Sequence, residues 1–195
     1  MLARSFSGQQ ARQDLSADGL FRRLRTAFEK VPDGRSDPSG ISLGNALMSG
    51  LALFSLKDPS LLAFDERRDD PSDNFRTIDH IGRVPGDTQM RAILDPVDPA
   101  HLRPMFRDVF RCLQRGKARE AFAYGDGHYL LSLDGTGYFS SSKITCSSCL
   151  EKHHRHGTVR YSHQMRGAAL VHPDHREVIP LAPEPNRPGG RRRPE

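Results

Sequence analysis

Two cysteines and a group of histidines in the last third of the sequence form a pattern that is typical of a metal site. Cys146 and Cys149 are separated by two residues, and four histidines follow them within the next fourteen residues. Zn²⁺ takes four nitrogen or sulfur ligands in a tetrahedron, and a two-residue gap lets two thiolates hold one ion. We therefore predict a zinc site in which His154 and His163 complete the ligand set of Cys146 and Cys149.

The spacing of these residues leaves a second interpretation open. The histidines follow Cys149 more closely than in a classical zinc finger, and they lack a clear helical His-x₃₋₅-His pair. The alternative is a polar, histidine-rich loop that carries two reduced cysteines. The remaining cysteine, Cys112, lies in an apolar helical pattern, where a small buried side chain is expected. Three cysteines with this spacing do not form a disulfide framework, which favours a reducing cytoplasm.

Asp134 is a second residue that could bind a metal ion. It follows the apolar run from Tyr129 to Leu133, which we interpret as a buried strand. A carboxylate at the end of such a strand is held rigidly yet faces solvent, as a metal ligand must. Gly135 and Gly137 would let the backbone turn and a polymer approach closely. The alternative is an aspartate that begins a turn, because Asp-Gly is a common turn dipeptide.

The periodicity of apolar residues predicts mostly short helices before these sites and strands around them. The helices are expected over residues 20–31, 42–57, 60–67, 73–81, 87–94 and 98–116. The start signals are Asp58-Pro59, Asp73 and Asp98-Pro99, because aspartate caps a helix and proline suits its first position. Strands are expected over residues 129–133, 158–171 and 177–181, with a turn at 172–175. Helices followed by a strand and a hairpin indicate an α+β or α/β fold.

The net charge of +5 is concentrated at the two ends of the sequence. Arg22, Arg23 and Arg25 lie on the basic face of the first predicted helix, and the sequence ends with Arg191, Arg192, Arg193 and two further residues. Such basic ends can bind DNA through its phosphates, or they can simply be solvated. The sequence contains no apolar stretch long enough to span a membrane and no secretory signal, so we expect a cytoplasmic protein without a membrane partner.

Several longer segments, taken in order, resemble bacterial insertion-sequence transposases of the DDE type. The segments FSLKDPSLLAFDERR (54–68), VPGDTQMR (84–91) and ILDPVDP (93–99) resemble the N-terminal region of these enzymes. The segment HYLLSLDGTGYF (128–139) resembles the first strand of their catalytic domain. HQMRGAALVHP (163–173) and EVIPLAP (177–183) resemble the hairpin that follows. The resemblance covers residues 42–185.

The resemblance implies a ribonuclease H-like fold in which three acidic residues bind two Mg²⁺ ions that act on a DNA phosphate. Asp134 matches the first acid, and the chain is expected to end before the other two. The expected organisation is a flexible basic N-terminus with a short helix (1–41), a helical region (42–122), the first strands of an incomplete ribonuclease H-like domain (123–185) and a disordered basic tail (186–195).

Three functions are compatible with these observations. The chain could be a transposase fragment, related to DNA transposition and inactive because its acidic triad is incomplete. It could be a non-enzymatic regulator that binds DNA, an intact transposase or a second copy of itself. It could also be a small zinc-binding domain whose fold depends on Cys146 and Cys149.

Overall fold

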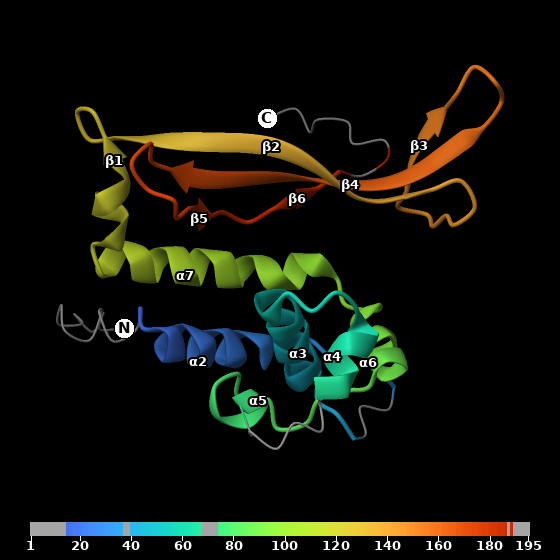
Figure 1. Ribbon diagram of the computed structural model, residues 1–195, viewed down its shortest axis with the longest axis horizontal. Helices are drawn as coiled ribbons and strands as arrows, with labels where there is room; N and C mark the ends of the chain where they lie inside the picture. Colours follow the sequence, from blue (N-terminus) through green and yellow to red (C-terminus); the bar gives the residue numbers. More distant parts are fainter. Residues whose placement is uncertain (1–14, 37–39, 68–73, 187, 189–195) are drawn as a thin grey trace. The chain divides into compact units, whose positions relative to one another are not determined.

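The computed structural model describes residues 15–36, 40–67, 74–186 and 188. The chain divides into two compact units, and the boundary falls between Gly116 and Lys117. The first unit is helical and the second is built on a β-sheet (Figure 1). We describe each unit by itself.

Six α-helices make up the regular structure of the helical unit in its described part. They are α2 (Ala17–Phe28), α3 (Leu43–Leu56), α4 (Leu61–Glu66), α5 (Asn74–Thr77), α6 (Asp87–Leu94) and α7 (Arg103–Arg115). A 3₁₀ turn, η2 (Pro99–Leu102), precedes α7, and its backbone is capped by the side chain of Asp98. The expected helix after Asp73 is shorter than predicted, because α5 ends at Thr77; Asp73 itself lies outside the described residues.

Serine side chains begin three of these helices. Ser16, Ser42 and Ser60 each accept a hydrogen bond from the backbone N–H three residues later, which satisfies a donor that the first helical turn leaves unpaired. The prediction that Asp58 would cap the helix that follows it is therefore wrong, because Ser60 is the N-cap of α4. Asp58 instead accepts a hydrogen bond from Arg67, at 2.8 Å between Oδ1 and Nε.

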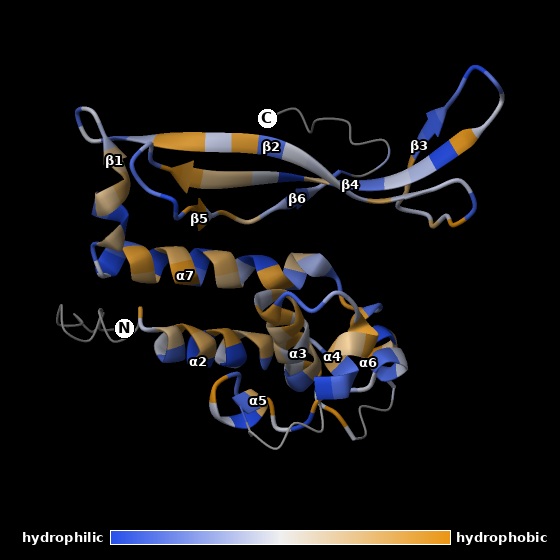
Figure 2. Cartoon of the chain, viewed as in Figure 1, coloured by the Kyte–Doolittle hydropathy of each residue, from blue (hydrophilic) through white to orange (hydrophobic). Residues whose placement is uncertain are grey.

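The hydrophobic core of the helical unit is centred on α3, which is the most apolar helix in Figure 2. Ala46 and Met48 of α3 have no exposed surface, and Phe64 of α4 is 1% exposed. Met90 and Ile93 of α6 complete this layer. Burial of each large aliphatic or aromatic side chain contributes about 1.5–3 kcal/mol, so this cluster is a main stabilising feature of the unit.

Arg25 links α2 to α3 across this core. Its Nη1 donates to Oδ1 of Asn45 at 2.6 Å, and its Nε donates to Oε1 of Glu29 at 2.9 Å. The same oxygen of Asn45 accepts a bond from the backbone N–H of Gly82 at 3.3 Å. Arg25 therefore joins α2 to α3, and Asn45 extends this link to the loop before α6.

The second unit contains a six-stranded antiparallel sheet. After a 3₁₀ turn, η3 (Ala118–Phe122), the strands are β1 (Ala123–Tyr124), β2 (His128–Ser141), β3 (Leu150–His153), β4 (Val159–Val171), β5 (Ile179–Pro180) and β6 (Glu184–Pro185). One edge of β4 pairs with β2. The opposite edge pairs in succession with β3, β6 and β5, so β4 is the central strand.

The first predicted strand is longer and more exposed than expected. Instead of ending at Leu133, β2 continues through Asp134 to Ser141, since residues 134–137 pair with β4 rather than forming a turn. The prediction of a buried strand is also wrong, because Leu131 is 50% and Leu133 is 72% exposed. The backbone stays extended through Asp-Gly because it pairs with β4 over its whole length. The turn preference of this dipeptide is a local signal and does not predict such pairing.

Two further strand predictions differ from the structure. The strand predicted over residues 177–181 is reduced to β5, which has two residues. The short strand β3 was not predicted, because its sequence Leu-Glu-Lys-His has one apolar residue and reads as a polar loop. Its partner β4 supplies the backbone hydrogen bonds that make it a strand.

The predicted order of helices followed by strands is confirmed, and the fold belongs to the mixed α+β class. The assignment of the sheet to an incomplete ribonuclease H-like domain stays a prediction. Within the described residues, no helix combines the length and apolar character that crossing a bilayer requires.

Asp79 lies in the loop before α6 and is 9% exposed. Its burial raises the pKa of the carboxyl group, and the smaller effect of the neighbouring His80 opposes this shift. A raised carboxyl pKa in the folded state stabilises the fold at low pH, and that stabilisation is lost as the pH rises through the raised pKa.

We therefore expect Asp79→Asn to raise the melting temperature of the helical unit at neutral pH, because the amide removes a buried charge. The difference from the unsubstituted protein should narrow as the pH is lowered through the raised pKa, where the carboxyl group is neutral as well. Thermal unfolding followed by circular dichroism at several pH values measures this. A difference that does not change with pH would show that the charge of Asp79 is not the cause.

Candidate metal centre

Cys146, Cys149 and His163 form a compact group of metal-ligating side chains in the sheet unit. The two sulfur atoms are 3.5 Å apart. Nε2 of His163 lies 3.3 Å from Sγ of Cys146 and 3.4 Å from Sγ of Cys149. The three donor atoms are therefore the corners of a nearly equilateral triangle.

The triangle has the dimensions of one face of a zinc coordination tetrahedron. With Zn–S and Zn–N bonds of ordinary length, tetrahedral geometry separates two sulfur ligands by about 3.8 Å and a sulfur and a nitrogen by about 3.6 Å. The observed separations of 3.5, 3.3 and 3.4 Å are within a few tenths of an ångström of these values. One ion can therefore contact all three atoms after a slight outward movement.

The topology of the sheet explains why the cysteines reach His163. Because β2 and β3 pair with opposite edges of β4, the segment 142–149 must pass across β4 to connect them (Figure 1). Leu150, the first residue of β3, is paired with Ser162. Extending this antiparallel register by one residue places Cys149 beside His163. The crossing segment thus carries both cysteines to the central strand.

Two aromatic rings of β2 orient the imidazole of His163. The ring of Tyr138 is stacked on it, with centroids 5.8 Å apart and an angle of 17° between the planes. The ring of Phe139, the residue paired with His163, lies at 5.6 Å. These contacts restrict the rotation of the imidazole, so its Nε2 stays directed at the two sulfur atoms.

A tight turn brings the two cysteines together. The backbone N–H of Cys149 donates to the carbonyl of Cys146 at 3.1 Å, and the backbone N–H of Cys146 donates to Sγ of Cys149 at 3.3 Å. The second hydrogen bond holds Sγ of Cys149 beside the backbone of Cys146 and so fixes the separation of the two cysteines. Cys149 is 5% exposed, whereas Cys146 is exposed, so one side of the group is open to solvent.

The structure does not bring His154, the other predicted zinc ligand, into this group. His154 begins the turn between β3 and β4, where its backbone N–H donates to the carbonyl of Thr158 at 2.9 Å. It lies four residues beyond Leu150, which corresponds to about 13 Å along an extended strand. The predicted set of four ligands is thus reduced to three.

Asp134 lies in the interior of β2, opposite Gly167 of β4, and is exposed. Its Oδ1 accepts a bond from the backbone N–H of Gly135 at 2.7 Å. Among the described residues, Asp134 belongs to no group of three potential metal ligands. The carboxylate of Glu184 is not on the same face, because Glu184 and Gly135 both pair with Arg166 and side chains alternate along a strand.

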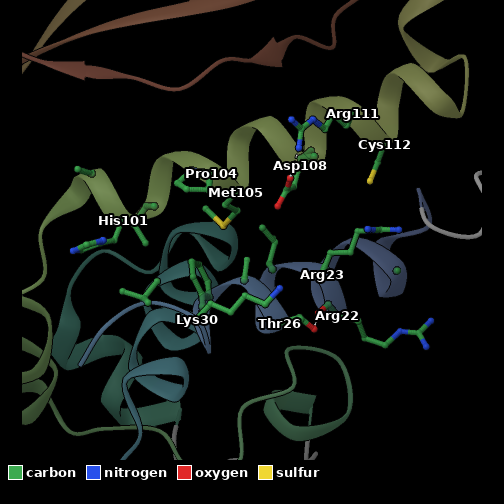
Figure 3. Close-up of a pocket in the computed structure, with 18 of the residues that line it drawn as sticks. Arg22, Arg23, Thr26, Lys30, His101, Pro104, Met105, Asp108, Arg111 and Cys112 are labelled. Atoms are coloured by element: carbon green, nitrogen blue, oxygen red, sulfur yellow. Dashed lines mark hydrogen bonds and ion pairs between the residues drawn. The ribbon is translucent and has the colours of Figure 1, made fainter. Parts of the chain in front are cut away.

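Two of the predicted DNA-binding arginines line a cavity of about 900 Å³ in the helical unit, between α2 and α7 (Figure 3). Arg22 and Arg23 contribute from α2. Arg25 does not line this cavity, because its guanidinium group links α2 to α3. Arg191, Arg192 and Arg193 lie outside the described residues.

The cavity also contains basic residues that the sequence did not single out. They are Lys30 shortly after α2, His101 before α7, and Arg111 and Arg115 on α7. One carboxylate, that of Asp108, lines it as well and pairs with Arg111 at 3.4 Å. Arg111 and Arg115 are four residues apart and so share one face of a helix, a signal that could have been read from the sequence.

Comparisons with protein-family models, curated proteins and solved structures gave no significant match for this chain.

Proposed function

We propose that the chain is a zinc-binding protein in which the ion holds the segment 142–149 against the central strand of the sheet. The observation that carries this proposal is the triangle of donor atoms from Cys146, Cys149 and His163. Thiolate and imidazole are ligands that suit Zn²⁺, and the separations suit tetrahedral coordination. The role of the ion is structural, since it joins two segments that are far apart in the sequence.

The small core of the sheet unit supports a structural role. Cys149, Leu170 and Ile179 are its buried hydrophobic residues in the described part of the chain, whereas the helical unit has a continuous core. Small units that bury little apolar surface usually need a metal ion, disulfides or a partner to be stable. One of the three buried residues is itself a proposed ligand, so metal binding and burial would occur together.

Hydrogen bonding alone accounts less well for the group. A neutral imidazole has at most one proton on Nε2, whereas this nitrogen is equally close to both sulfur atoms. A disulfide between Cys146 and Cys149 would satisfy the cysteines and leave Nε2 of His163 without a role. A single cation at the centre of the triangle explains all three separations.

A second candidate function is electrostatic binding of nucleic acid by the helical unit. The cavity between α2 and α7 has four arginines and one lysine on its lining against a single carboxylate. Apolar side chains of both helices, among them Leu24, Met105 and Val109, line it as well, so the cavity combines cationic groups with apolar surface. Closely spaced phosphates are the repeating anions that such a surface attracts.

The role of a transposase fragment remains a proposal that rests on the resemblance of segments within residues 42–185. In-line displacement at a phosphate needs two Mg²⁺ ions held by several carboxylates. Asp134 supplies one carboxylate, and Glu184 faces the opposite side of the sheet. We therefore propose that the chain does not cleave DNA by itself, and that any link to transposition is through binding.

Zinc binding should appear as about one zinc ion per chain in protein purified without chelators. Cys149→Ser should lose this zinc, while Cys112→Ala should keep it, since Cys112 lies in the helical unit. Zinc at about 100 times its Kd should stabilise the sheet unit by about 2.7 kcal/mol, which raises the melting temperature by on the order of 10 °C. Metal analysis and thermal unfolding with and without chelator measure both effects.

His154→Ala serves as a matched control, because it removes a histidine near the site that the structure excludes from the ligand group. It should retain both the zinc and the thermal shift. Zinc that persists in Cys149→Ser, or a melting temperature that chelator leaves unchanged, would contradict a structural zinc ion at this position.

Nucleic-acid binding should depend on the cavity rather than on net charge. Lys30 and Arg115 line it, are exposed and have no ion-pair partner among the described residues. The double variant Lys30→Glu, Arg115→Glu should weaken binding of a short duplex at least about tenfold at low salt, and lower the slope of log affinity against log salt by about 2. Fluorescence anisotropy with several unrelated duplexes measures this.

The control is Lys57→Glu, Arg83→Glu, which changes the net charge equally at exposed sites that do not line the cavity. It should bind DNA nearly as well as the unsubstituted protein, and the loss in the cavity variant should be similar for all sequences, because phosphate contacts carry no base information. Equal losses in both double variants would show that binding follows overall charge and that the cavity has no special role.

A further inference from the structure

We infer that the zinc ion has a coordination position open to solvent, and that this position accepts a thiolate from outside the sheet unit. The inference rests on the proposed zinc site. It follows from three observations: three donors where zinc takes four, the placement of every other histidine of the sheet unit, and the exposure of Cys146.

The histidines that follow Cys149 in sequence cannot supply the fourth ligand from their positions. His153 ends β3 and is paired with Val159, and its Nε2 lies 3.3 Å from a carboxylate oxygen of Glu151. His154 and His156 belong to the turn beyond it. The strand β3 is about 13 Å long and lies between this turn and the position of Cys149 and His163.

The other histidines of the sheet unit lie at the opposite end of the long strands. His172 and His175 follow β4, with ring centroids 4.8 Å apart, and Nε2 of His175 lies 3.0 Å from the carbonyl oxygen of Ala121. His128 begins β2. Nine residues of extended chain, about 30 Å, separate His163 from His172. No histidine in the described part of the sheet unit is therefore within reach.

The remaining cysteine cannot supply the fourth ligand from within the sheet unit. The chain has three, and the one outside the site, Cys112, is 4% exposed and lines the cavity between α2 and α7 of the helical unit. Among the described residues, no other histidine, cysteine, aspartate or glutamate has a donor atom in the group, so the fourth donor is water or a group that arrives through solvent. Cys146 is exposed, so the solvent has access to the ion from its side.

A thiolate is the external donor that the site favours. Two thiolates already make the coordination sphere soft, and soft ligands are bound preferentially by such a centre over carboxylates. Three cysteines and one histidine form one of the closed ligand sets that structural zinc adopts. A low-molecular-weight thiol would complete that set, whereas water would occupy the position in its absence.

Cobalt substitution of the full-length protein tests the inference, because Co²⁺ occupies tetrahedral zinc sites and has visible and near-ultraviolet absorption. The probe is 2-mercaptoethanol, with acetate at the same concentration as the control. Addition of the thiol should shift the visible bands and raise the thiolate-to-cobalt charge-transfer absorption by about one half, as two thiolates become three. Acetate should leave the spectrum nearly unchanged.

The variants His154→Ala and Glu151→Gln should respond to the thiol as the unsubstituted protein does. A stoichiometric cobalt complex of the unsubstituted protein that does not respond to the thiol would overturn the inference. A response that then appears in either variant would show that the chain closes its own site. That outcome leaves the zinc proposal intact. Failure of the protein to bind cobalt at all would overturn both.

Discussion

The pairing of β4 with strands on both of its edges is the constraint on which the rest of the sheet unit depends. It takes β2 along one edge and β3, β6 and β5 along the other. Because β2 and β3 are consecutive in the chain, the segment between them has to cross β4. This crossing brings two cysteines to a histidine that is at least fourteen residues away in sequence.

The two units differ in what holds them together. The helical unit has a core around Met48, Phe64 and Ile81, each 2% exposed or less. The sheet has extensive backbone hydrogen bonding but few buried side chains, and backbone bonds contribute about 1 kcal/mol each after their exchange with water. A metal ion bound by three side chains would cross-link the crossing segment 142–149 to β4. Apolar burial in this unit is too limited to hold that segment in place. This difference is the physical reason to assign the ion a structural role.

Much of the fold could be predicted from the sequence. The helices α3 and α6 follow from apolar periodicity, and the strand β4 from a long β-prone segment, since these signals are local. The extension of β2 past Asp134 and the existence of β3 could not be predicted, because both depend on hydrogen bonds to β4. Local turn preference at Asp134 and Gly135 was overridden by that pairing.

The candidate site was predicted in part for the same reason. The spacing of Cys146 and Cys149 is a local signal, so both residues were identified from the sequence alone. The choice between histidines needs the register of β3 and β4, which places His163 beside Cys149 and His154 at the far end of the hairpin. Arg22 and Arg23 were predicted to bind DNA, which stays a prediction. The cavity that they line with Arg111 and Arg115 was not predicted, because it forms only where α2 and α7 pack together.

The most direct test of the account is X-ray absorption spectroscopy of the zinc-loaded protein, which reports the atoms around the ion and their distances. We expect two sulfur atoms at about 2.3 Å from the ion and lighter atoms at about 2.0–2.1 Å, one of them with the outer-shell scattering of an imidazole ring. His163→Ala should remove that imidazole signal, and His154→Ala should leave it in place. A first shell without sulfur, or an imidazole signal that disappears with His154 instead of His163, would contradict the assignment of Cys146, Cys149 and His163 as the metal site.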